Sequence, residues 1–471
     1  MAVESTTSDK IIGYLPNEKP EFGKMILLGF QHVITMFPAT VLAALLMGFP
    51  VNTVLAVTGF GTVVALTVSK LWLGFYIPLY YGSSFSYIAA VLAFTAGTFE
   101  FGGAAPPEVL SVVQVGFLAT GLINIITGFL IRGVGGKQAL DKVLPPVITG
   151  SVATTIGIGL GKAALDMSSG VCCGADGSGV WWTVAMITLT ATILFSVYLQ
   201  GKGFIGLLPI LLGAIVGYIV AIPFGLVDFS VFGQTSLVTT PHLTFPTFND
   251  QSLTIIFSVG IMAIATIPES TAHLYQISLY VDHLAVEQGK ERYFLSRYVG
   301  ANLVIDGLND FINGLFGSTA GTNYGENNSL MVITRNYSGP VLMTAGVIAV
   351  LLGFIGPLKD AVSSVPTAVS GGLAIYLFGV IGMQGIALMM SEKVNLFDPK
   401  QLAIGAIILI VGIGGNIGFP GGFLPIPLLQ GVFPNGWPAI ATAAVLGIVF
   451  NLIFRIFPAP ERDHIDIGLD H

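Results

Sequence analysis

Long apolar segments separated by short polar loops dominate the chain. A segment of about 20 mostly apolar residues is long enough to cross a bilayer as an α-helix. On this basis the pattern predicts fourteen membrane-spanning segments, at about residues 25–48, 51–69, 72–96, 109–131, 143–161, 180–199, 203–226, 253–279, 298–316, 318–334, 339–357, 362–390, 401–418 and 435–457. The third, ninth and tenth segments are the least helix-like, because Gly, Ser, Thr, Asn or Asp interrupts them. The chain is therefore predicted to be an all-α polytopic membrane protein.

The composition agrees with this prediction. Only 9% of the 471 residues are charged and 54% are hydrophobic, whereas a soluble domain carries about 25% charged residues. These values exclude a disordered chain, a nucleic-acid-binding protein and an ordinary cytosolic enzyme. The 60 glycines suit helices that pack closely in lipid, where small residues let backbones approach each other.

The basic residues indicate the orientation. Cytoplasmic loops of membrane proteins carry an excess of Lys and Arg. If the N-terminus is cytoplasmic, all of the 18 basic residues except Lys162 and Lys359 fall on the inner side of the fourteen predicted segments. We therefore expect a multi-pass protein of the cell's inner or plasma membrane with both termini in the cytoplasm.

Fourteen segments divide into seven plus seven. Because seven is odd, a second half that resembles the first must enter the membrane in the opposite orientation, as in many secondary transporters. Two small, polar stretches lie at matching positions of the halves, Tyr81–Tyr87 in the third segment and Ser318–Ser329 in the tenth. Interrupted segments at such positions indicate a substrate site.

A few ionisable side chains lie within the predicted segments, and each is a functional candidate because a carboxylate at the bilayer centre costs about 2.5–3.5 kcal/mol on insertion scales. They are His32, Glu269, His273, Asp306 and Glu326, with Asp310 nearer a segment end.

Glu269 and His273 are four residues apart and therefore lie on one face of a helix. We expect the imidazole to hydrogen-bond the carboxylate, although a structural pair that locks the eighth segment to a neighbour is the alternative. Glu326 lies between Gly325 and two asparagines. A carboxylate, amides and accessible backbone suit a planar heterocycle, since the carboxylate accepts N–H donors and the amides serve ring carbonyls.

The other polar candidates have less specific patterns. Phe85 in the third segment can supply an aromatic face or be a plain core residue. His32, beside Gln31, is typical of helix packing, and Asp306 suits either a site-organising or a packing role. Asp310 is expected to cap or pack near the outer end.

The two cysteines of the chain, Cys172 and Cys173, are adjacent in a polar loop. Their spacing excludes a metal site and a disulfide framework and predicts two loop thiols, with a strained vicinal disulfide as the alternative.

Four ordered motifs carry a family resemblance: Gln31-His32, Gly82–Phe85, Glu269 with His273 at the fourth following position, and Glu326–Arg335. Together they resemble the nucleobase–ascorbate transporters, also called the nucleobase:cation symporter-2 family, over essentially the whole chain. The resemblance implies a seven-plus-seven inverted repeat with two short antiparallel strands in the third and tenth segments. Known members couple nucleobase uptake to protons or sodium and are often dimers, with no cofactor or metal.

The resemblance also implies two domains that move against each other. The core domain comprises residues 25–135 and 251–358, and the gate domain comprises residues 136–250 and 359–458. Residues 1–24 and 459–471 are expected to form cytoplasmic tails.

Residue choice within the motifs favours the uracil permease branch. Members of that branch carry Tyr-Gly-Glu-Asn in the tenth helix, here at residues 324–327, and His at the position of His273. Xanthine and urate members usually carry Gln-Asn and Asp there. Ser329 replaces the signature glycine, and Asp306 matches an acidic position known in purine members. These two features keep a xanthine or other purine-base cation symporter open as the alternative.

The resulting hypothesis is a proton-coupled uracil importer, with sodium as the alternative coupling ion. Substrate binding is assigned to Glu269, Glu326, Phe85, Gly325 and Tyr324, proton coupling to Glu269 and His273, and support of the site to Asn327, Gln31, His32 and Asp306.

Two other classes of protein are less compatible with the pattern. A nucleobase channel or facilitator would need a ring of like residues or a continuous polar pore, but the few intramembrane charges cluster in segments eight to ten. A metalloprotease would need a second histidine beside Glu269-x-x-x-His273.

Overall fold

The computed structural model of the protein describes residues 13–100, 103–134, 142, 144–175, 177, 179–233 and 235–457. Residues 1–12 of the expected N-terminal tail, the whole expected C-terminal tail and the boundary expected at residues 135 and 136 lie outside these residues.

The elements of the first half follow in the order α1 (Phe22–Met47), α2 (Val51–Leu73), β1 (Tyr81–Ser83), η1 (Phe85–Tyr87), α3 (Ile88–Thr95), α4 (Pro107–Val134), α6 (Pro146–Gly159), α7 (Gly161–Ser169), η2 (Val171–Cys173), α8 (Gly179–Tyr198), η3 (Gly203–Leu207), α9 (Pro209–Ala221) and η4 (Phe229–Val231). Those of the second half are α10 (Ser252–Ile255), the π-helical turn η5 (Ile256–Gly260), α11 (Ala263–Glu287), η6 (Leu295–Tyr298), α12 (Val299–Phe316), β2 (Gly321–Asn323), α13 (Gly325–Thr334), α14 (Gly339–Leu352), α15 (Gly356–Ser363), α16 (Thr367–Ser391), α17 (Pro399–Leu409), the π-helical turn η7 (Ile410–Gly414), α18 (Gly415–Gly418), η8 (Pro420–Gly422), β3 (Phe423–Leu424), β4 (Trp437–Pro438) and α19 (Ala439–Ile456).

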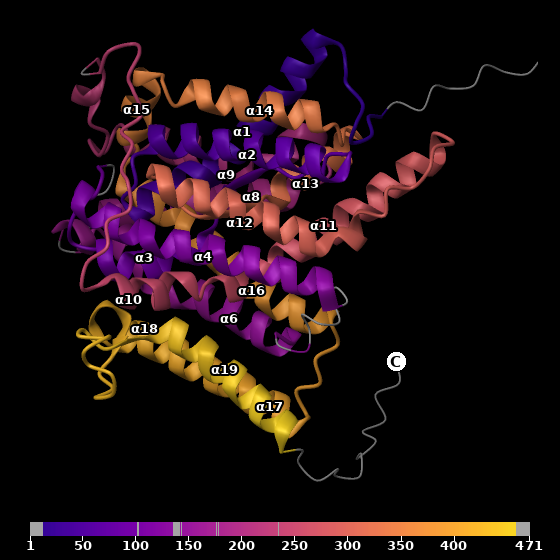
Figure 1. Cartoon of the computed structure of the whole chain (residues 1–471). Coiled ribbons are helices and arrows are strands. Elements are labelled where there is room, and N and C mark those ends of the chain that lie inside the picture. The colour runs from indigo at the N-terminus through magenta and orange to yellow at the C-terminus, as the bar shows by residue number, and fades with distance from the viewer. Residues whose placement is uncertain are drawn as a thin grey trace, which may run out of the picture.

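Figure 1 shows these helices side by side in one bundle, with α14 and α15 at one margin and α17 to α19 at the opposite margin. Among the described residues, nine helices are long and apolar enough to cross a membrane. Each predicted segment contains at least one helix, and the third and tenth also contain a strand that precedes their own helix.

The ninth segment differs from its prediction. We expected an interrupted helix, yet α12 runs without a break from Val299 to Phe316. It ends at Gly317, whose φ of 83° is the left-handed conformation that closes many helices. The polar residues do not break α12, because their side chains lie on its buried side and face neighbouring elements.

The two strands of the interrupted segments pair in the middle of the bundle. β1 and β2 are antiparallel, with Gly82 opposite Thr322 and Ser83 opposite Gly321. The close approach requires glycine, since a β-carbon at Gly82 would lie 2.4 Å from the ring of Tyr324. The predicted pair of short antiparallel strands is confirmed, and a second small sheet joins β3 to β4.

Glycines also mediate the main helix contacts. A β-carbon at Gly121 of α4 would lie 2.6 Å from the carbonyl oxygen of Gly307 in α12, and one at Gly59 of α2 would lie 2.5 Å from that of Gly346 in α14. The helices α4 and α14 contain the fourth and eleventh segments, and α2 and α12 contain the second and ninth. Each contact therefore joins a helix of the first half to one of the second, and exchanging the halves converts one contact into the other, as an internal repeat requires.

A second set of helices packs in the same manner around α6 and α16. A β-carbon at Gly157 of α6 would lie 2.5 Å from the carbonyl oxygen of Phe378, and one at Gly385 of α16 would lie 2.4 Å from that of Gly150. The helix α16 also packs against α7 and α8, and α17 packs against α19 and α6. Helices α1, α2, α4, α12 and α14 contact one another in the other set.

Candidate functional site

The strand pair brings the starts of two helical segments together. η1 begins at Phe85, two residues after β1 ends, and α13 begins at Gly325, two residues after β2 ends. Because the strands are antiparallel, the two segments leave the pair in opposite directions. The first N–H groups of a helix have no partners within it and can bind acceptors. In η1 the N–H of Ser86 is already accepted by the Ser84 hydroxyl at 3.2 Å.

Two carboxylates and an aromatic ring are accessible beside these turns. Glu269 of α11 is exposed, whereas Phe85 and Glu326 are half-buried. The charges of Glu269 and Glu326 are close enough to interact electrostatically. Pro268 inside α11 cannot donate the helical hydrogen bond, so it leaves a carbonyl of the preceding turn without that partner.

His273 does not adopt the arrangement that its spacing suggested. We expected the imidazole to hydrogen-bond Glu269, but its Nδ1 lies 2.8 Å from the backbone oxygen and 2.7 Å from the side-chain oxygen of Asn323. Its Nε2 would be 3.0 Å from a β-carbon at Gly325. The imidazole is thus held against the end of β2 and the start of α13, because tertiary contacts outweigh the shared helix face.

Tyr324 joins several elements. Its side chain is buried, and its hydroxyl lies 2.9 Å from the Thr40 hydroxyl of α1 and donates to the backbone oxygen of Ser83 at 3.0 Å. The side chain therefore connects the two halves of the strand pair to α1.

The residues after Glu326 connect α13 to neighbouring helices. Asn327 is buried and donates its side-chain amide to Nδ1 and to the backbone oxygen of His32, each at 3.1 Å. Asn328 donates to the backbone oxygen of His273 at 3.4 Å. Gln31 is half-buried, and its side-chain oxygen is buried without a hydrogen-bond partner among the described residues.

Asp306 belongs to a polar face of α12 that the sequence reasoning recognised only in part. The five residues of this face, all fully buried, are Asn302, Asp306, Asn309, Asp310 and Asn313. Asp310 accepts the backbone N–H of Gly321 in β2 at 2.6 Å and the side-chain amide of Asn124 in α4 at 3.0 Å. The signal was present in the sequence, since polar residues three or four apart share one helix face.

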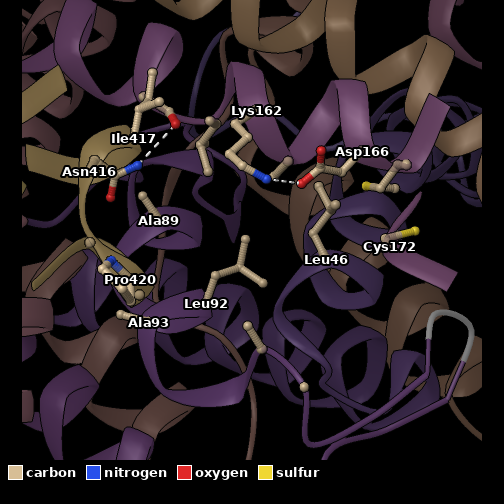
Figure 2. A pocket seen from close by; sticks show the side chains of 18 of the residues that line it. Leu46, Ala89, Leu92, Ala93, Lys162, Asp166, Cys172, Asn416, Ile417 and Pro420 are labelled. Atoms are coloured by element: carbon tan, nitrogen blue, oxygen red, sulfur yellow. Dashed lines mark hydrogen bonds and ion pairs between the residues drawn. The ribbon is translucent and has the colours of Figure 1, made fainter. Parts of the chain in front are cut away.

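A cavity of about 1040 Å³ lies elsewhere between the two sets of helices. Figure 2 shows Lys162, Asp166 and Cys172 on one side of it and Asn416 and Pro420 on the other, with the ion pair between Lys162 and Asp166 drawn as a dashed line. Its wall includes Ala89 and Leu92 of α3, and Ala89 is four residues after Phe85. Sequence reasoning did not predict this cavity, because its lining comes from distant segments.

The cysteine loop borders the same cavity. Both cysteines are free thiols in this structure and exposed. Desolvation of the Cys172 thiol and its contact with Cys173 raise the pKa of Cys172 to about 12. The Cys172 thiol is therefore protonated at neutral pH and a weak nucleophile, since the thiolate is the reactive form.

The fold and the site together define a class of protein. A bundle with repeated helix contacts, in which two interrupted segments present polar groups at their meeting point, is the architecture of secondary transporters. Comparison with known proteins gives the family. The model of the permease family that comprises xanthine and uracil permeases matches residues 23–421. The chain belongs to this family, the nucleobase–ascorbate transporters.

Uracil permeases are among its relatives. The uracil permease of Bacillus caldolyticus is 32% identical over 463 residues, which cover 95% of this chain and 98% of that protein. The uracil permease of Escherichia coli strain K12 is 31% identical over 458 residues, which cover 96% of each chain. The protein is therefore a multi-pass membrane permease and not an enzyme.

The fold itself is found in a solved structure of low sequence similarity. It is the structure of a murine anion transporter, solute carrier 26 family member A9, which is 12% identical in sequence to this chain. The two structures superpose with a TM-score of 0.64, and the match covers 95% of this chain and 70% of that chain. This transporter fold consists of two inverted repeats of seven segments, which agrees with the repeated glycine contacts.

Proposed function

We propose that the protein imports uracil by proton symport. The observation that carries the proposal is the pair of accessible carboxylates, Glu269 and Glu326, beside the first turns of η1 and α13. Uracil is planar and has two ring N–H donors and two carbonyl acceptors. Its N–H groups would donate to Glu269 and Glu326, and backbone N–H groups near Phe85 and Gly325 would donate to its carbonyls.

The aromatic ring of Phe85 would stack on the bound base, which contributes about 0.5–1.5 kcal/mol beyond burial. Tyr324 and Asn327 would support this arrangement indirectly, because their polar groups bond to Ser83, Thr40 and His32.

Proton coupling follows from the cost of moving charge through the membrane. Two carboxylates that face one substrate repel each other, so binding of one proton, together with uracil, lowers the charge of the site. We assign this proton to Glu269, with His273 positioning the end of β2 beside it. Because Glu269 and Glu326 interact, the pH dependence of uptake would reflect the titration of both carboxylates together.

Movement would occur between the two sets of helices, with the set that contains α1 to α4 and α11 to α14 carrying the substrate past the set that contains α6 to α9 and α16 to α19. The cavity between α3 and α6 to α7 lies at this boundary. In the cell, both termini would be cytoplasmic, as the distribution of basic residues suggests.

The test is uptake of radiolabelled uracil into proteoliposomes with and without an inward proton gradient. We expect the wild type to show saturable accumulation of uracil driven by the gradient. Accumulation by Glu269→Gln should be at least about 100-fold lower, because the Gln side chain can neither ionise nor release a proton. Undiminished, pH-dependent uptake by Glu269→Gln would contradict the assignment. Leak that is independent of the gradient would indicate a channel or facilitator.

A competition panel decides the substrate. Unlabelled uracil, thymine, xanthine and hypoxanthine are added in turn to the same uptake assay. Competition by uracil well below the concentration at which xanthine competes supports the proposal. The reverse order would assign the protein to purine bases. Replacing the proton gradient by a sodium gradient tests the alternative coupling ion.

A further inference from the structure

The polar face of α12 carries two buried carboxylates that the proposed substrate contacts do not use. Asp306 and Asp310 are four residues apart, so they lie one helical turn from each other on the same face, and both are fully buried. None of the ion pairs among the described residues includes either of them. Two buried carboxylates without a positive partner are unfavourable, each by several kcal/mol, so binding of a proton would stabilise the pair.

The two carboxylates differ in their hydrogen bonds. Asp310 has the two N–H donors from Gly321 and Asn124, and such donors stabilise the ionised form. Neither oxygen of Asp306 has a hydrogen-bond partner at normal geometry among the described residues, although the hydroxyl of Ser270 lies near it. Asp306 is therefore the member that is better suited to carry a proton.

Several polar groups on the helix face of Asp306 lack hydrogen-bond partners. The side-chain oxygens of Asn302 and Asn309 and the amide nitrogen of Asn309 are buried without a partner among the described residues. They are four residues before and three residues after Asp306, so they share its helix face. A proton on Asp306 would provide an O–H donor for one of these acceptors and would remove a buried charge, and unlike a metal ion it needs no cavity.

The pair is connected to the substrate site at two points. Ser270, which follows Glu269, accepts the side-chain amides of Asn302 at 2.9 Å and Asn323 at 2.7 Å. Asp310 holds Gly321 at the other end of β2. A change of charge at the pair therefore acts on both ends of the strand that precedes Glu326.

The titratable groups that face the pair come from three elements. Tyr81 of β1 and Tyr87 of η1 interact electrostatically with both aspartates, and Glu269 of α11 interacts with Asp306. The helices α4 and α2 contribute neutral groups, Asn124 against Asp310 and the backbone of Gly61 against Asn309. Among the described residues, none of the groups named here as facing the pair is positively charged.

We propose that the Asp306–Asp310 pair binds one proton, held at Asp306, and forms a second proton site behind β2 that keeps the strand positioned for uracil binding. The inference rests on the proposed transport of uracil and extends it. Loss of this proton gives the pair a second negative charge. The added charge disturbs the contacts of Asn302, Ser270 and Asn323 and thereby weakens uracil binding. Asp306 is a positioning residue, since it does not touch the substrate.

Infrared difference spectroscopy of the full-length protein tests the proton directly. Titration from acid to alkaline pH should remove a protonated-carboxyl band, and labelling of aspartate with carbon-13 should shift this band. The band should be absent in Asp306→Asn and present in Glu269→Gln. A band that Asp306→Asn leaves unchanged would overturn the proposal. If Asp306→Asn does not fold, an aspartate label that fails to shift any band in the wild type has the same consequence.

Equilibrium binding of uracil provides the second readout. The wild-type affinity should fall at least about tenfold as the pH rises through the titration of the pair, which corresponds to 1.4 kcal/mol. Asp306→Asn should bind uracil with an affinity that depends much less on pH, because the neutral amide imitates the protonated acid. A pH dependence equal to that of the wild type would contradict the inference, as would binding that requires sodium in the wild type but not in Asp306→Asn.

These outcomes are distinguishable from failure of the proposed function. If the wild type does not accumulate uracil in a proton gradient, the symport proposal fails whatever the infrared result. If the wild type accumulates uracil and Asp306→Asn retains both the infrared band and the pH-dependent affinity, only the second proton site fails.

Discussion

The two arms of the strand pair have similar backbones and different chemistry. The first arm, Tyr81–Thr95, consists of β1, η1 and α3, and the second arm, Gly321–Thr334, consists of β2 and α13. The first presents hydroxyl groups and Phe85, whereas the second presents Asn323, Glu326 and two further asparagines. An internal repeat thus supplies the same geometry twice, and the side chains divide the tasks of stacking and polar recognition between the arms.

The arms also differ in what holds them. Neighbouring side chains hold the backbones of both arms, since Thr62 of α2 donates to the backbone oxygen of Tyr81 at 3.0 Å and Asp310 accepts the backbone N–H of Gly321 at 2.6 Å. The side chains of the first arm add hydroxyl contacts, such as that of Ser83 with Thr319. Those of the second arm add amide hydrogen bonds from Asn323, Asn327 and Asn328 to three other residues. Substitution of polar side chains should therefore disturb the second arm more than the first.

The largest effect is expected where the arms meet. Gly82→Val should reduce uracil uptake at least about 100-fold and lower the thermal stability. A β-carbon at this position would lie 2.4 Å from the ring of Tyr324, and overpacking at a site without space costs about 1–3 kcal/mol or more. Uptake assays and thermal unfolding measure the two effects. Gly379→Ala is the control, since its β-carbon meets nothing within 4 Å. Wild-type uptake by Gly82→Val would show that the close contact of the arms is dispensable.

The second-largest effect is expected for the charged side chain of the second arm, compared with a neutral one in the first arm. Glu326→Gln should reduce uracil uptake about 10- to 100-fold, because hydrogen bonds to a charged group contribute about 1.5–3 kcal/mol. Ser84→Ala in the first arm should cost much less. The Ser84 hydroxyl only caps η1, accepting the N–H of Ser86 at 3.2 Å, and such a cap contributes about 1 kcal/mol. Equal losses in uptake assays would contradict the division of tasks.

Phe85→Ala tests the stacking assigned to the first arm. Uracil affinity should fall about 2- to 13-fold, the equivalent of the 0.5–1.5 kcal/mol of an aromatic pair, with the pH dependence of uptake unchanged. Phe85→Tyr, which keeps the ring, should bind uracil with nearly wild-type affinity. If Phe85→Leu also binds as the wild type does, burial alone accounts for the residue.

The smallest effect is expected at Ser329 of the second arm. Its hydroxyl donates to the backbone oxygen of Gly325 at 3.0 Å within α13. Ser329→Gly should change uptake by less than about threefold and lower helix stability slightly, since Gly is about 0.8–1.0 kcal/mol less favourable than Ala in a helix. Uptake and thermal unfolding of this variant and of Ser329→Ala measure it. A large gain in affinity for xanthine would instead make Ser329 a determinant of specificity.

Much of the fold was predictable because membrane segments are encoded locally. Runs of apolar residues located the segments, and the interrupted stretches located both strands, since polar backbone at membrane depth needs partners. The ninth segment was predicted wrongly as interrupted. Its asparagines and aspartates read as helix breakers in a local window, but in α12 they meet partners such as Gly321 and Ser270 from other elements.

The candidate site was predictable as a set of residues and not as an arrangement. Scarcity of charge identified Glu269, Asp306 and Glu326, because each costs free energy in lipid. Partners were not predictable from spacing. His273 shares a helix face with Glu269, yet it binds Asn323, fifty residues away in the chain. Asp310 was expected to cap or pack near the outer end of its segment, and only the position of β2 gives it the N–H of Gly321.

The sequence by itself determined the class of this protein, the order of its segments and its membership of the permease family, because hydrophobic length and motif spacing are properties of the chain alone. The tertiary structure decided which polar groups meet. It placed Tyr324 between the two arms, His273 against β2 and two buried aspartates behind it. The physical reason is that a hydrogen bond depends on distance and direction in space, and segments far apart in sequence acquire both only when they pack.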